Sequence, residues 1–279
     1  MKIAASALAL NPRAALCDDL IAAPPCAQAF AVGYGGRIAA LVNELRVTHR
    51  IRKPGDYLYR AGDSFHSLYV LHAGFARTCY TSADGREQTT GLHLRGDILG
   101  FDAVASGTHG SDAVVLDECD VLTIPYEHVI ACSRRSPELV RELYEAFSAE
   151  IRRDRDMMLN MHSLPAAGRV AAFLLEMSTR FASRGFSATQ LQMRLTRQEI
   201  GSMLGIELET VSRAFSRFAR LGLITVCLRQ VVLLDIDGLQ DIAAQPQGER
   251  SGRESDGGRH FLTGSGWVSP LVVAACREN

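Results

Sequence analysis

The sequence predicts an α+β protein in three parts: a β-roll (jelly roll), one long helix and a C-terminal winged helix-turn-helix. Three observations carry this prediction. Short apolar runs divided by turn signals occupy residues 50–124, one uninterrupted helical pattern runs from Ser136 to Pro165, and a glycine-containing turn separates two helical patterns after Leu195. The expected divisions are a Cys-containing N-terminal segment (1–35), the roll (36–135), the long helix (136–163), the winged helix-turn-helix (164–245) and a tail (246–279).

The roll is predicted from its turns. Signals such as Pro54-Gly55-Asp56 and Asp84-Gly85 recur through residues 50–124, and a spacing of about 8 to 12 residues is typical of sandwiches and rolls. Asp84-Gly85 is the strongest hairpin signal among them. The Ala-, Pro- and Gly-rich residues 1–35 and the Gly- and Ser-rich residues after 245 show no pattern of regular structure.

The long helix is predicted from its ends. Ser136 is suited to the N-cap, Pro137 follows at the first helical position, and Pro165 is the next breaker, which implies about 26 helical residues. A heptad seam runs along it, formed by Val140, Tyr144, Phe147, Ile151, Asp154, Met158 and Met161. Such a seam between two domains favours a dimer interface over the core of a monomer.

The helix-turn-helix is predicted from a capping box, Thr196 with Glu199, and from Gly205, which ends the first helix with a left-handed residue. A second helix begins near Leu208. We expect its core face to consist of Leu208, Val211, Phe215 and Phe218. The opposite face carries Glu209, Ser212, Arg213 and Ser216. These polar types are the ones that contact base edges and phosphates in the major groove, the alternative being an ordinary solvated face.

Composition places limits on function. The chain has 279 residues, 47% hydrophobic and 22% charged, an ordinary globular balance that excludes fibrous and wholly disordered classes. The formal net charge is −1, from 30 basic and 31 acidic residues, so any nucleic-acid site must be local. Residues 190–230 supply one, with six arginines against three glutamates. The β runs at 223–228 and 230–235 would pair as a hairpin that follows the second helix. Because this unit is locally positive, we expect Arg197 and Arg217, together with Thr196, to contact the DNA backbone.

Seven scattered cysteines do not resemble a secreted disulfide framework. No stretch approaches the roughly 18 apolar residues of a membrane helix, and the first residues lack a signal-peptide core. We therefore expect a soluble, cytoplasmic protein without a membrane partner.

Over residues 45–240 the sequence resembles the Crp/Fnr family of bacterial transcription regulators, most closely the Fnr branch. The motifs that carry the resemblance stand at 59–63, 67–69, 90–97, 100–103, 154–157, 180–187, 195–205, 209–213 and 222–224. The resemblance implies a cyclic-nucleotide-binding-like roll as sensor, a homodimer built on the long helix, contact with RNA polymerase, and double-stranded DNA as ligand. It also implies that Glu209, Ser212 and Arg213 read a TTGAT half-site, as the motif E-x-x-S-R does in the Fnr branch.

The signal is less determined. Cyclic-nucleotide members hold the phosphate with an arginine, and here Ser111-Asp112-Ala113 stands in its place, which argues against cyclic AMP because a buried phosphate would lack a cation. The oxygen sensor of the family binds a 4Fe-4S cluster through four cysteines. Cys17 and Cys26 match two of these positions, but Leu20 and Leu122 occupy the others.

Cys119 lies three residues before Leu122, an odd step that points it to the other face of a strand. Three hypotheses stay open. The first is an iron–sulfur cluster on Cys17, Cys26 and Cys119 with a fourth ligand that is not cysteine, the second is redox chemistry of free thiols, and the third is no sensing role for these thiols. The cofactor is therefore left unassigned.

The resemblance also assigns a dimer switch to Asp154, flanked in the seam by Ile151 and Met158, because two carboxylates repel across a two-fold axis. The alternative is that the helix rotates Asp154 to the rim. Polymerase contacts are implied at Asp84, Gly85 and Arg184, on loops expected to be exposed.

The sequence thus indicates a homodimeric regulator that responds to oxygen or redox state, and not an enzyme. One rival is a cupin-like metal enzyme, since six histidines lie near the roll: His49, His66, His72, His93, His109 and His128. No pair of them has the tight spacing of a facial metal site, so no metal ligand is assigned. Other rivals are a helix-turn-helix used only for protein contact and a family member that answers a different signal.

Overall fold

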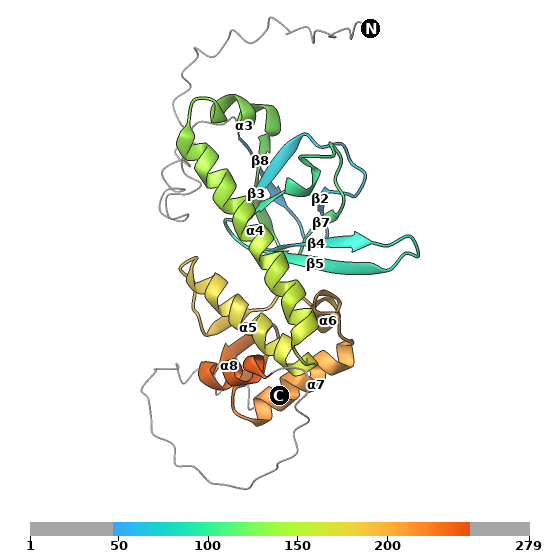
Figure 1. Ribbon diagram of the computed structural model, residues 1–279, viewed down its shortest axis with the longest axis vertical. Coiled ribbons are helices and arrows are strands. Elements are labelled where there is room, and N and C mark those ends of the chain that lie inside the picture. The colour runs from blue at the N-terminus through green and yellow to red at the C-terminus, as the bar shows by residue number, and fades with distance from the viewer. Residues whose placement is uncertain (1–46, 246–279) are drawn as a thin grey trace, which may run out of the picture.

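The computed structural model describes residues 47–245. The predicted segments 1–35 and 246–279, and with them Cys17 and Cys26, lie outside the described residues. Figure 1 shows a β domain and a smaller, mainly helical domain connected by the long helix α4 (Pro137–Ser163). Within residues 47–245, no helix combines the length and the apolar character that crossing a membrane requires.

The β domain is the predicted roll, formed by two four-stranded antiparallel sheets. The first contains, in order, β1 (Thr48–Arg52), β8 (Cys119–Pro125), β3 (Ser67–Ala73) and β6 (Ile98–Leu99). The second contains β2 (Tyr57–Tyr59), β7 (Asp112–Val115), β4 (Ala76–Thr81) and β5 (Glu87–His93). The predicted hairpin joins β4 to β5, and Gly85 in its turn has φ +80°, a value that suits glycine.

Each face of the first sheet has its own core. Side chains such as Leu71 and Val121 point between the two sheets, whereas Leu122 and Ile124 point away from the roll interior. The second group packs on α3 (Tyr126–Ser133) and on the start of α4, with Leu139 almost fully buried. A short 3₁₀ helix, η1 (Phe101–Ala103), follows β6.

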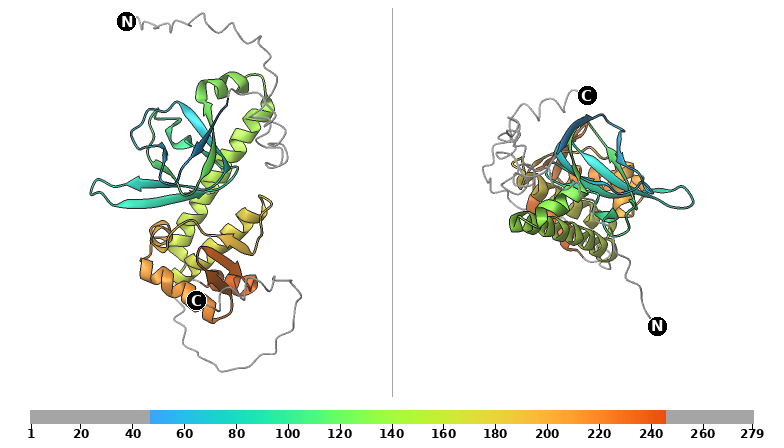
Figure 2. Two further views of the ribbon diagram at one scale, coloured as in Figure 1. Left: turned by 180° about the vertical axis from the view of Figure 1, so that it is seen from behind. Right: turned by 90° about the horizontal axis from the view of Figure 1, so that it is seen from above.

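Helix α4 has the predicted ends. The Oγ atom of Ser136 accepts a hydrogen bond from the amide of Leu139 at 3.3 Å, and Leu164 directly before Pro165 is the C-cap. The roll lies on one side of α4 in Figures 1 and 2.

Only some residues of the predicted heptad seam on α4 lie on its exposed surface. Tyr144, Ile151 and Met158, spaced by seven residues, are 69%, 51% and 61% exposed. Phe147 instead stacks on Phe101 of the roll, with 3.9 Å between ring centroids. Met161 lies close to Gly205, in the C-terminal domain. The prediction that Phe147 and Met161 belong to the outer seam is therefore wrong, because the domains on either side of α4 bury the adjacent strip of the helix.

The C-terminal domain contains α5 (Ala166–Ala182), α6 (Arg197–Leu204), α7 (Leu208–Arg220) and α8 (Ile236–Ala244). A three-stranded sheet in the order β10 (Ile224–Cys227), β11 (Gln230–Leu233) and β9 (Gln190–Gln192) completes it. The β10–β11 hairpin was predicted from the sequence, whereas β9, α3 and α8 were not. The core of this domain extends to Leu92 and Leu94 of the roll, so the two domains share buried apolar surface.

Candidate nucleic-acid interface

The helix-turn-helix has the predicted capping hydrogen bonds and the predicted glycine at its turn. The amide of Glu199 donates to the Thr196 hydroxyl at 3.2 Å, and the Glu199 carboxylate accepts from the Thr196 amide at 2.7 Å, which completes a capping box at the start of α6. Gly205 ends α6 at φ +63°. A Cβ on Gly201 would lie 2.5 Å from the carbonyl oxygen of Ile206, so the close approach of the turn to α6 requires a glycine there as well.

Helix α7 presents two chemically distinct faces. Val211, Phe215 and Phe218 are buried in the domain core, as predicted. Glu209 and Arg213 are exposed on the other side, and Ser212 is half-buried between the faces. The Arg213 guanidinium lies 3.5 Å from the Thr210 hydroxyl, within its own helix. The helix therefore offers an acceptor and a forked donor to solvent from a rigidly packed support.

Leu208 differs from the prediction. It was expected in the core but is 48% exposed, because it is the first residue of α7 and precedes the buried Val211 by three positions.

The predicted backbone contacts surround this helix. Thr196 is exposed at the N-terminus of α6, and Arg217 is exposed in the last turn of α7. Arg197 is half-buried with its guanidinium carbon 3.3 Å from the centroid of the Phe215 ring, and burial lowers its pKa. Leu228 at the tip of the β10–β11 hairpin is 97% exposed with φ +53°, so the hairpin projects as a wing.

The helix-turn-helix is also held against the roll. Arg77 of β4 pairs with Glu199 at 3.0 Å, and the Thr89 amide donates to the Ser202 hydroxyl at 2.9 Å. Figure 1 shows the β4–β5 hairpin on the roll side of this contact and α6 on the other. The capping glutamate of the first helix thus also forms an ion pair between the domains.

A buried ionic cluster makes a second contact between the domains. Asp97, whose side chain is 5% exposed, bonds both Arg180 and Arg184, the first at 2.7 Å. Arg180 also donates to the Leu92 carbonyl, and Arg184 to the Arg95 carbonyl. We call Asp97, Arg180 and Arg184 the domain clasp.

Two domain-family models match the chain. Residues 50–136 match the cyclic nucleotide-binding domain and residues 168–242 match the Crp-like helix-turn-helix domain. The transcriptional regulatory protein btr of Bordetella pertussis is 36% identical over 237 residues, covering 85% of this chain and 96% of that protein. The chain belongs to the Crp/Fnr family of transcription regulators.

Other relatives agree with this assignment. The fumarate and nitrate reduction regulatory protein of Escherichia coli K12 is 38% identical over 189 residues, 68% of this chain and 76% of that protein. The structure of FixK2 from Bradyrhizobium japonicum superposes with a TM-score of 0.66 at 28% identity, covering 72% of this chain and 99% of that one. These relatives are transcription regulators and not enzymes, which removes the cupin-like alternative.

The sensor positions of this Crp/Fnr protein do not fit an iron–sulfur cluster held by the roll. Leu122, at the fourth ligand position of the family's oxygen sensor, is 1% exposed in the apolar core under α3 and α4. Cys119 points into the roll interior instead, where its thiol donates to the Phe75 carbonyl at 3.1 Å. Burial raises the pKa of Cys119 to about 12, so it stays a neutral thiol. Its position weighs against the predicted ligand or redox role.

A cavity of about 210 Å³ lies between the roll and α4, on the side of the sensor. Its charged lining residues are the acids Asp102, Glu150, Asp154 and Glu176 and the arginines Arg153 and Arg180. Ser111 belongs to the stretch 111–113 that takes the place of the arginine of cyclic-nucleotide members, and its hydroxyl donates to Asp102 at 3.2 Å. Burial raises the pKa of Glu150 to about 7 and also raises that of Asp154. The Asp102 carboxylate next to Ser111 is unfavourable for a phosphate at that position, which agrees with the prediction against cyclic AMP.

The three residues predicted to contact RNA polymerase do not lie on one exposed surface. Asp84 and Gly85 form the exposed tip of the β4–β5 hairpin, where Asp84 pairs with Arg86 at 2.6 Å. Arg184 was expected on an exposed loop but is only 18% exposed, because the domain clasp holds its guanidinium.

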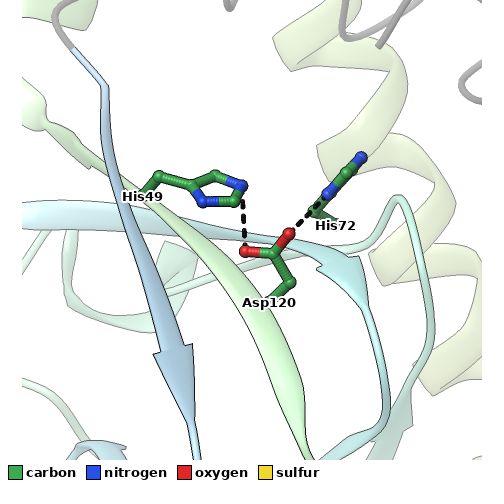
Figure 3. A group of neighbouring side chains, drawn as sticks. All are labelled: His49, His72 and Asp120. Atoms are coloured by element: carbon green, nitrogen blue, oxygen red, sulfur yellow. Dashed lines mark hydrogen bonds and ion pairs between the residues drawn. The ribbon is translucent and has the colours of Figure 1, made fainter. Parts of the chain in front are cut away.

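One cluster joins two of the histidines noted near the roll to an aspartate that the sequence did not single out. His49 of β1 and His72 of β3 converge on Asp120 of β8, the strand between them (Figure 3). The sequence analysis assigned no metal ligand, because no histidine pair near the roll has the tight sequence spacing of a facial site. Residues far apart in the chain meet through strand pairing, for which spacing along the sequence carries no signal.

Proposed function

We propose that this Crp/Fnr regulator binds a TTGAT-like palindrome as a homodimer and controls transcription in response to oxygen or redox state. The observation that carries the proposal is the exposed face of α7, where Glu209 and Arg213 extend from a helix whose other face is buried. A helix supported in this way can enter the major groove without rearranging its core.

The residue types on α7 match the base edges of such a site. The fork of Arg213 suits guanine O6 and N7, Glu209 can accept from cytosine N4, and the Ser212 hydroxyl can bond a base or a phosphate. Thr196, Arg197 and Arg217 would contact the backbone, which sets orientation and not sequence preference. Arg197 would keep its stacking on Phe215 while its remaining N–H groups face a phosphate.

The dimer is proposed on the outer strip of α4. Tyr144, Ile151 and Met158 recur every seven residues and are mostly exposed in the single chain. A second copy of the helix packed along them would bury this apolar strip. Asp154 lies beside this strip and also lines the cavity of about 210 Å³ between the roll and α4, so its charge can link the cavity to the dimer interface as a switch.

The signal and the polymerase contact rest on the relatives. Proteins named for fumarate and nitrate reduction are 38% identical, and both compounds are electron acceptors, which supports a respiratory or redox signal. With Cys119 buried, we assign sensing thiols to Cys17 and Cys26. The hairpin tip at Asp84 and Gly85 is exposed and available to RNA polymerase. Because bacterial DNA lies in the cytoplasm, we place the protein there.

Fluorescence anisotropy with a labelled TTGAT palindrome and a scrambled duplex tests the DNA proposal. We expect Arg213→Ala to weaken binding to the palindrome by about 5- to 150-fold and to abolish the preference over the scrambled duplex. Arg217→Ala should weaken both duplexes equally and reduce the salt slope by about 1. Arg86→Ala, at an 85% exposed arginine of the hairpin tip, is the matched control and should bind as the wild type does.

Wild-type binding that is equal for the two duplexes would refute the proposal, as would normal discrimination by Arg213→Ala. The signal is tested separately, by anaerobic purification followed by an absorption spectrum and an iron and sulfide count. A colourless, iron-free protein whose DNA affinity is the same under oxidising and reducing conditions would exclude the oxygen or redox response.

A further inference from the structure

Three side chains that the DNA interface does not use meet on one face of the first sheet. Figure 3 shows His49 and His72 turned toward Asp120 between them. The Oδ1 atom of Asp120 lies 2.9 Å from Nε2 of His49, and its Oδ2 atom lies 2.7 Å from Nδ1 of His72. The three ligand atoms are all within 4.8 Å of one another.

Strand backbones position this cluster. It spans β1, β8 and β3, which are neighbours in the sheet, with Asp120 on the central strand. Cys119 and Val121 on either side of Asp120 are buried in the roll interior, so the alternation of the strand directs Asp120 to the other face. Side chains held on paired strands keep a fixed geometry better than side chains on loops.

A β-bulge places His72. Leu71 pairs with Val121 and Ala73 pairs with Asp120, so His72 is the extra residue between two consecutive pairs. A bulge of this kind changes the direction of a side chain and is common beside functional sites. Here it allows Leu71 to stay fully buried while His72 lies next to the carboxylate.

Two imidazole nitrogens and one carboxylate oxygen are the donors that divalent first-row transition ions prefer, whereas Mg²⁺ and Ca²⁺ prefer oxygen alone. Ligand atoms around a tetrahedral Zn²⁺ with bonds of about 2.0–2.1 Å stand about 3.3 Å apart. The Asp120 carboxylate would therefore need to retreat from each imidazole by only about half an ångström to admit an ion.

The solvent exposure of the three side chains and the missing hydrogen bond of one Asp120 oxygen both fit a bound metal ion. The side chains of His49, His72 and Asp120 are 45%, 24% and 15% exposed, so the cluster opens to solvent on the His49 side, where an ion could enter and water could complete its coordination. The Oδ1 atom of Asp120 is buried and makes no hydrogen bond of good geometry among residues 47–245, its contact with His49 being electrostatic. A cation would satisfy that oxygen.

We propose that His49, His72 and Asp120 bind one divalent transition-metal ion of the Zn²⁺ or Fe²⁺ class. The bound ion joins β1, β8 and β3. His72 also lines an apolar cavity of about 330 Å³ whose other walls include Phe181 and Phe186 of the C-terminal domain. The ion therefore lies next to the junction of the sensor and DNA-binding domains. The site is separate from the recognition helix, and the proposal does not rest on the proposed DNA target or signal.

The test uses the full chain without an affinity tag, stripped with a chelator and titrated with Co²⁺. Cobalt bound by imidazole and carboxylate shows weak ligand-field bands, whereas thiolate ligands add an intense charge-transfer band, so the spectrum separates this site from the cysteines. We expect one Co²⁺ per wild-type chain without the thiolate band, displaced by Zn²⁺ or by anaerobic Fe²⁺ but not by Mg²⁺. His49→Gln, His72→Gln and Asp120→Asn should each weaken binding at least tenfold.

His66→Gln is the matched control, an exposed histidine of the same domain outside the cluster, and should bind as the wild type does. His49→Gln is the decisive variant because its side chain is the most exposed of the three and its loss leaves the core intact. Far-UV circular dichroism confirms that it is folded. A wild-type chain that binds no Co²⁺, a thiolate band lost on cysteine alkylation, or unchanged affinity in folded His49→Gln would each overturn the proposal.

Discussion

The domain clasp makes a quantitative prediction about stability. Asp97 holds two arginines at the junction of the roll and the C-terminal domain, and all three side chains are less than a fifth exposed, at 5%, 13% and 18%. The substitution Asp97→Asn keeps the shape and one acceptor oxygen but removes the charge. Two largely buried guanidinium groups then lose their shared counter-ion.

The size of the effect follows from this burial. Removing one partner of a buried ion pair typically costs about 3–5 kcal/mol, because the remaining charge is left uncompensated. The retained amide oxygen places Asp97→Asn near the lower limit, about 3 kcal/mol. For a chain of this size the melting temperature should fall by roughly 6–12 °C.

The same cluster predicts a pH dependence. Burial by itself would raise the pKa of Asp97, but the charges of Arg180 and Arg184 outweigh it and hold the pKa well below its ordinary value. A carboxyl with a depressed folded-state pKa stabilises the protein above its unfolded pKa of about 3.9, and this contribution is lost as the pH falls toward the folded value. The wild type's advantage over Asp97→Asn should therefore be complete at pH 7 and smaller at pH 3.

Thermal unfolding followed by far-UV circular dichroism at both pH values measures the effect. Asp84→Asn is the matched control, because Asp84 pairs with Arg86 at the exposed hairpin tip and its loss should leave the melting temperature unchanged. An Asp97→Asn variant that melts within a degree or two of the wild type at pH 7, or a difference between the two proteins that is the same at pH 3, would refute this role of Asp97.

Three further predictions concern single side chains. Burial raises the pKa of Glu150 to about 7, so ionisation of its carboxyl lowers the free energy of unfolding as the pH rises from about 4 to 7. At pH 8 Glu150→Gln should therefore melt at a higher temperature than the wild type, with a free energy of unfolding greater by at most about 3 kcal/mol. At pH 4 it should show no such gain. Thr196→Ala removes the cap of α6 and should cost about 1 kcal/mol in urea unfolding, whereas Thr196→Ser should cost almost nothing; equal losses in both would exclude the capping role. Cys119 should resist iodoacetamide in the folded protein and react only after unfolding, whereas half-buried Cys227 should react before Cys119, as peptide mapping will show; early modification of Cys119 would contradict its placement in the roll interior.

Much of the fold was predictable because its signals are local. The cap at Ser136, the breaker at Pro165 and the capping box at Thr196 act within a few residues, and each lies where the sequence indicated. The apolar face of α7 followed from helical periodicity in the same way, apart from Leu208 at its first turn. These features depend on hydrogen bonds and side-chain spacing inside one element.

The errors share a different cause. Phe147 and Arg184 were assigned to free surfaces, but the roll and Asp97 bury them through contacts with distant parts of the chain. The strand β9 has three residues and is defined by its pairing with β11, so its own sequence carries little signal. The histidine cluster on Asp120 likewise exists only after three strands pair.

By itself, the sequence determined the order of roll, long helix and winged helix-turn-helix, and the polar face of α7 that would meet DNA, because caps, turns and periodicity are written within single segments. Tertiary structure alone decided which strip of α4 stays exposed, that Cys119 faces the roll interior, that Asp97 joins the domains, and that His49, His72 and Asp120 meet. Each of these depends on register and packing between segments up to 89 residues apart, as in the hydrogen bond from Arg184 to the carbonyl of Arg95, and no local pattern encodes such contacts.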